Sequence, residues 1–75
     1  MIEADANPIP LNEQSLVILE GIVDRYSLRA VIEGLAHICF LKAEHLRENW
    51  QDDVSARAWL RDARKLERIA GQMEG

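Results

Sequence analysis

The residues in this sequence that could do chemistry are few and widely spaced. His37 and His45 are eight positions apart, which on a helix is about 12 Å along the axis and too far for both side chains to bind one ion. Carboxylate metal sites in helical bundles use Glu-x-x-His pairs on facing helices, and the sequence contains no such pair. We therefore expect no bound metal and no other cofactor.

The same segment contains acidic residues that could act together with the histidines. Glu33 and His37 have the i, i+4 spacing of neighbours on a helix surface, so we expect them to form a surface pair. An enzyme would need a site built across subunits, with Glu33, His37, Glu44 and Glu48 facing their copies around a metal. Because no motif supports such a site, we expect no catalytic residue and no enzymatic activity.

Cys39 is the single cysteine of the chain. It lies between Leu35 and Leu46 on an apolar stripe, where a thiol behaves as a small hydrophobic side chain. A nucleophilic cysteine would need a base and an electropositive setting. An unpaired thiol without an N-terminal export signal is typical of a reducing compartment, so we expect a cytoplasmic protein.

The clearest chemical pattern is a run of basic residues near the C-terminus. Residues 54–75 carry five basic and three acidic side chains, whereas the whole chain has a net charge of −4. The five basic residues fall on one side of a predicted helix, at the spacing i, i+4, i+7, i+8 and i+11. We call this set the basic face; it consists of Arg57, Arg61, Arg64, Lys65 and Arg68.

Two interpretations of the basic face remain open. The planar guanidinium group of arginine suits phosphate and carboxylate, which would make the face a binding site for nucleic acid or for an acidic partner. Alternatively, it is a solvated helix surface with local ion pairs, such as Asp53 with Arg57 or Arg64 with Glu67. We favour the second interpretation, because charged faces are common on amphipathic helices.

Local signals predict the helices that position these residues. Two prolines in residues 1–11 predict an extended, flexible N-terminal arm. Asn12 is a good N-cap for a first helix, and Ser27 is a good N-cap for a second helix that runs from residue 28 to about residue 48. The chain after the arm, residues 12–75, should therefore form a single helical domain.

A third helix is predicted from about residue 54 to about residue 70, after the break at residues 49–53. Its buried face should comprise Trp59, Ala63, Leu66 and Ala70, and Gly71 should be its C-cap. Because the connection is short, the second and third helices should form an antiparallel hairpin. The expected fold is all-α, with three helices and a long central one.

The central helix has two adjacent apolar stripes. The first contains Leu28, Ile32, Leu35, Cys39 and Leu46, and the second contains Val31, Gly34, Ile38 and Leu41, with His45 at its edge. Together they span a wider arc than one partner helix covers, so this helix should be packed on two sides. Either the first helix covers the second stripe, or another copy of the chain does. We expect a dimeric bundle with Val31, Gly34, Ile38, Leu41 and His45 in the interface.

Size and composition restrict the class of protein. A chain of 75 residues forms at most one domain with a thin core, and no apolar run approaches the roughly 20 residues that span a membrane. These features favour a small helical interaction module, an adaptor, inhibitor or regulatory subunit that binds an unidentified protein. Nucleic-acid binding by the basic face is the alternative.

Overall fold

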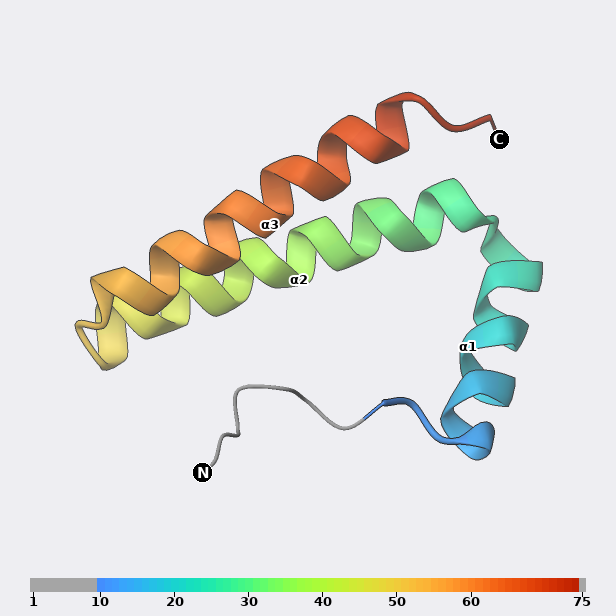
Figure 1. Ribbon diagram of the computed structural model, residues 1–75, viewed down its shortest axis with the longest axis horizontal. Helices are drawn as coiled ribbons and strands as arrows, with labels where there is room; N and C mark the ends of the chain where they lie inside the picture. The colour runs from blue at the N-terminus through green and yellow to red at the C-terminus, as the bar shows by residue number, and fades with distance from the viewer. Residues whose placement is uncertain (1–9, 75) are drawn as a thin grey trace.

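A computed structural model describes residues 10–74 of the chain. In this range the chain forms three helices and no strand: α1 (Glu13–Tyr26), α2 (Leu28–Asn49) and α3 (Asp53–Gly71). The helix α3 lies alongside α2 as an antiparallel hairpin, and α1 turns away from it at the N-terminal end of α2 (Figure 1). The predicted all-α fold with a long central helix is confirmed; the arm, residues 1–11, lies almost wholly outside the described residues.

The three helices begin at capped residues. The Asn12 side chain accepts a hydrogen bond from the backbone N–H of Ser15 (2.8 Å), and Ser27 Oγ accepts one from Ala30 (3.1 Å). Asp52 caps α3 by accepting from the Ser55 N–H (3.0 Å). Each cap supplies a partner to an N–H group that has no acceptor within its own helix, which explains why the helices begin where they do.

The end of α3 differs from the glycine cap that the sequence predicts. Gly71 is the last residue of α3, not its cap; Gln72 caps the helix with a φ of −96° and donates its backbone N–H to the carbonyl of Ile69. A tight last turn thus gives the final carbonyl groups of α3 hydrogen-bond donors without a residue in the left-handed conformation. After α2, it is Gln51 that adopts a left-handed conformation, with a φ of 52°.

A seam of small side chains holds α2 and α3 together. The buried residues of α2 are Ala36, Cys39 and Ala43, and those of α3 are Ala56, Ala63 and Ala70. The buried alanines of α3 recur every seven residues, the repeat that keeps one side of a helix against an antiparallel partner. Because a methyl group is short, the two backbones can approach closely along this seam.

The sequence pattern predicted the buried face of α3 only in part: Ala63 and Ala70 are buried as expected, but the two larger residues are not. Trp59 is 37% exposed and Leu66 is half-buried, whereas Ala56, which the pattern did not select, is fully buried. On α2, Leu28 and Leu35 also remain substantially exposed. Large side chains lie at the edges of the seam because its centre has room only for small ones.

The helix α1 is attached to the hairpin far more loosely. None of its residues is buried, and within residues 10–74 it packs only against α2, near the junction of the two helices. The Cα radius of gyration is 14.3 Å, compared with about 11 Å for a compact domain of this length. The expectation that α2 is packed on two sides therefore holds only at its N-terminal end.

The junction between α1 and α2 is a single strained residue. Ser27 caps the end of α1 and the start of α2, and its backbone has a φ of 121° and a ψ of 157°. Residues other than glycine rarely adopt this region, which costs of order 1–3 kcal/mol. The angle between α1 and the hairpin thus depends on one unusual backbone conformation.

Candidate functional site

An apolar groove lies where α1 meets α2, and we call it the α1–α2 groove. Its volume is about 330 Å³. It is lined by Leu19, Ile22 and Tyr26 of α1 and by Ala30, Val31, Gly34, Leu35 and Ile38 of α2. None of these side chains carries a charge, and Tyr26 remains 63% exposed. The groove is a surface that could bind apolar side chains of a protein.

The predicted interface residues divide into two groups. Val31, Gly34 and Ile38 line the groove, whereas Leu41 and His45 lie further along α2 and do not line it. Leu41 is 50% exposed. In the described part of the chain, α1 thus covers only the N-terminal part of the second apolar stripe.

The sequence pattern predicts the α2 wall of the groove, through the second apolar stripe, and leaves open whether the first helix or another copy covers it. The α1 wall consists of Leu19, Ile22 and Tyr26, which share one face of the helix at helical spacing. Because α1 makes little contact with the hairpin, this face remains partly exposed.

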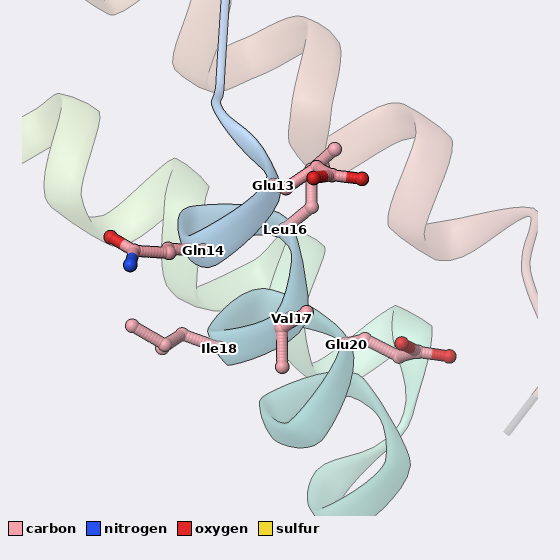
Figure 2. Close-up of a pocket in the computed structure, with 6 residues that line it drawn as sticks. All are labelled: Glu13, Gln14, Leu16, Val17, Ile18 and Glu20. Atoms are coloured by element: carbon pink, nitrogen blue, oxygen red, sulfur yellow. The ribbon is translucent and has the colours of Figure 1, made fainter.

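The first turns of α1 also expose apolar side chains but do not form a cleft. Six residues surround a shallow hollow: Glu13, Gln14, Leu16, Val17, Ile18 and Glu20. Figure 2 shows that their side chains project in several directions from the first turns of a single helix. Without a second wall this hollow cannot enclose a small ligand, although Val17 and Ile18 are about two-thirds exposed.

The basic face lies on the side of α3 opposite the alanine seam, and all five of its residues are exposed. Among the described residues the ion pair present is elsewhere, between Arg29 Nε and Glu33 Oε2 at 3.5 Å. The expected pairs of Asp53 with Arg57 and of Arg64 with Glu67 are not formed; Arg57 Nε instead donates to the backbone carbonyl of Asp53 (3.3 Å). The charges of this face are therefore not neutralised within the described chain.

Glu33 pairs with Arg29 rather than with His37, so the expected pair of Glu33 and His37 is wrong. Both residues are one helical turn from Glu33, on opposite sides, and the permanently charged guanidinium is the stronger partner. Arg29 also donates to the carbonyl of Met73 (3.4 Å). It thereby links the beginning of α2 to the residues just after α3.

His45 uses both ring nitrogens at the C-terminal end of α2. Trp50 Nε1 can only donate, so His45 Nε2, 3.3 Å away, must accept. Asn49 Nδ2 lies 2.8 Å from His45 Nδ1, the second ring nitrogen. The polar atoms of His45 are therefore engaged within its own chain.

The thiol of Cys39 lies in the seam and is 8% exposed. Burial raises its pKa, and the negative charge of Asp62 raises it further. Both effects disfavour the thiolate, which is the reactive form. This environment agrees with a packing role for Cys39. No group of three or more His, Cys, Asp or Glu residues suited to a metal ion occurs in residues 10–74.

Comparison with protein-family models, with curated proteins and with solved structures finds no match for this chain. None of the helices in residues 10–74 has the length and apolar character needed to span a membrane.

Proposed function

We propose that this chain is a small helical interaction module, which acts in the cytoplasm by binding protein and not by catalysis. An adaptor, an inhibitor or a regulatory subunit would each act in this way. The observation that supports the proposal is the uncharged α1–α2 groove together with the exposed apolar residues next to it. A soluble domain rarely exposes adjacent apolar side chains unless they bind something.

A photo-crosslinking amino acid tests this proposal directly. Placed at Ile22, in the groove, it should capture one defined protein in cells, either the chain itself or another. Placed at Glu44, which is exposed on α2 and outside the groove, it should capture that protein much less. Equal or absent capture at the two positions would show that the groove is not a binding surface.

Nucleic-acid binding is a second candidate, supported by the basic face and the absence of ion pairs for its residues in the described chain. Four of its five residues are arginine, which binds phosphate through two hydrogen bonds. The net charge of −4 opposes this function, because the rest of the protein repels a polyanion.

Fluorescence anisotropy with a labelled 20-mer, single-stranded and duplex, distinguishes the two candidates. Binding through the basic face should weaken steeply with salt. Substituting Arg61 and Arg64 with Glu should then weaken binding and flatten its salt dependence, whereas Arg47→Glu, on α2, should do so much less. If no binding occurs at 50 mM salt, the basic face is a solvated surface.

A further inference from the structure

We infer that the α1–α2 groove is occupied by the same groove of a second copy, in a two-fold symmetric dimer whose α2 helices cross at Gly34. This inference rests on the proposed function and names the partner of the same surface. It is supported by three observations: the absence of charge in the groove, the exposed apolar area around it, and the open space at Gly34.

The absence of charge makes the groove compatible with itself. In a two-fold interface each surface patch meets an identical patch, so a charged residue near the axis would face a like charge. The groove contains no charged side chain from either helix. Patches that bind a different protein face no such restriction, and the basic face of α3 could not pair with itself in this way.

The exposed apolar area is sufficient for a modest dimer. Ile22, Tyr26, Leu35 and Ile38 line the groove, and Ile18 and Leu41 adjoin it; all six are 41–66% exposed. Taking roughly 100 Å² for a full aliphatic side chain and about 200 Å² for tyrosine, their exposed parts total roughly 400 Å². Homodimer interfaces are about 65% apolar, so each copy would bury roughly 600 Å².

Two such surfaces bury roughly 1,200 Å², the lower limit of a stable, specific interface. The dimer should therefore exchange with monomer in a range of concentration that solution measurements can reach. This also explains how α1 can keep its position with no buried residue of its own, since the second copy would cover its exposed face.

Gly34 indicates where the two α2 helices cross. A glycine in the middle of a helix costs about 1 kcal/mol relative to alanine, and a Cβ atom at Gly34 would meet nothing within 4 Å in the chain. The fold of one chain therefore does not require glycine here. A second helix that crosses closely at this point does require glycine, because a Cβ atom would keep the two backbones apart.

Gly21 provides a matched control, because a Cβ atom there also meets nothing within 4 Å and it does not line the α1–α2 groove. Both Gly34→Ala and Gly21→Ala should make the monomer more resistant to unfolding. Only Gly34→Ala should weaken the dimer, by about tenfold or more in Kd. If Gly34 affected only the stability of the monomer, the two substitutions would change the Kd of the dimer alike.

The dimer is measured by analytical ultracentrifugation over a concentration series. Ile38→Asp should raise Kd at least 100-fold, whereas Ile69→Asp, at a similarly exposed position on α3, should leave it nearly unchanged. Far-UV circular dichroism confirms that both variants are folded. If the Ile38 variant fails to fold, the Gly34 and Gly21 pair still decides the question.

The inference is wrong if the chain is monomeric up to about 1 mM, or if Gly34→Ala and Gly21→Ala give the same Kd. If the chain is monomeric but the crosslinker at Ile22 captures another protein, the proposed function stands and only the second copy is excluded. If neither a dimer nor a crosslinked protein is found, both fail.

Discussion

The substitution Ala63→Leu tests how closely α2 and α3 are packed. Ala63 is fully buried at the centre of the alanine seam, and leucine adds three carbon atoms where a methyl group now fills the space. Overpacking of this kind costs about 1–3 kcal/mol. A domain of this length has about 4–11 kcal/mol of total stability, so the loss should be a large fraction of it.

Thermal unfolding followed by circular dichroism measures this loss. For a domain of this size 1 kcal/mol corresponds to about 4–8 °C in Tm, so a loss of about 2 kcal/mol should lower Tm by about 8–16 °C. Arg61→Leu is the control, because it places the same side chain on the exposed side of the same helix and should change stability by at most about 0.5 kcal/mol.

Equal Tm values for the Ala63→Leu variant and the parent protein would refute the close packing of the seam. All samples should be compared at one protein concentration, since self-association also raises Tm. A loss with Arg61→Leu as large as that with Ala63→Leu would indicate a general effect of leucine on α3 and would equally contradict the argument.

Three further predictions concern single residues. Ser27→Gly should stabilise the chain by about 1 kcal/mol in urea unfolding, because relief of backbone strain exceeds the small loss of the cap; Ser27→Ala, which keeps the strain, should destabilise it. Hydrogen bonds from Ser55 hold the pKa of Asp52 below its ordinary value. The stability that the Asp52 carboxylate contributes is therefore full above about pH 4 and is lost as the pH falls through the lower pKa of the folded state. Asp52→Asn should remove this contribution to the pH dependence of stability. Cys39 should react with iodoacetamide at least tenfold more slowly in the folded than in the unfolded protein at pH 8, and Asp62→Asn should restore little of that rate because burial is the larger cause. Native rates equal to those in denaturant would show that the thiol is accessible.

The helices and the caps of α1 and α2 could be predicted from the sequence because they depend on local chemistry. Asn12 and Ser27 each accept the expected hydrogen bond from an N–H three residues later. Such contacts lie within one turn of chain, so residue type and spacing are enough to locate them. Gly71 was misjudged because a tight last turn can end a helix without a glycine cap.

Only half of the seam, namely Cys39, Ala63 and Ala70, could be predicted from the sequence. Ala36, Ala43 and Ala56 contribute little to a hydrophobic pattern, so larger neighbours such as Leu35 and Trp59 dominated the predicted buried faces. The distance between two helices decides which of these side chains fits, and that distance results from both helices together. The five predicted interface residues remain a prediction, since one chain alone cannot test them.

The position of α1 is equally absent from the sequence pattern, because it depends on the backbone of Ser27. The helix has 14 residues and is therefore about 21 Å long. Pivoting about Ser27 by 10° would move its far end by about 4 Å, while Tyr26, next to the pivot, would hardly move. A rotation at Ser27 would therefore leave the groove width beside Tyr26 almost unchanged and would alter it near Leu19, where it would change the size of the side chain that fits.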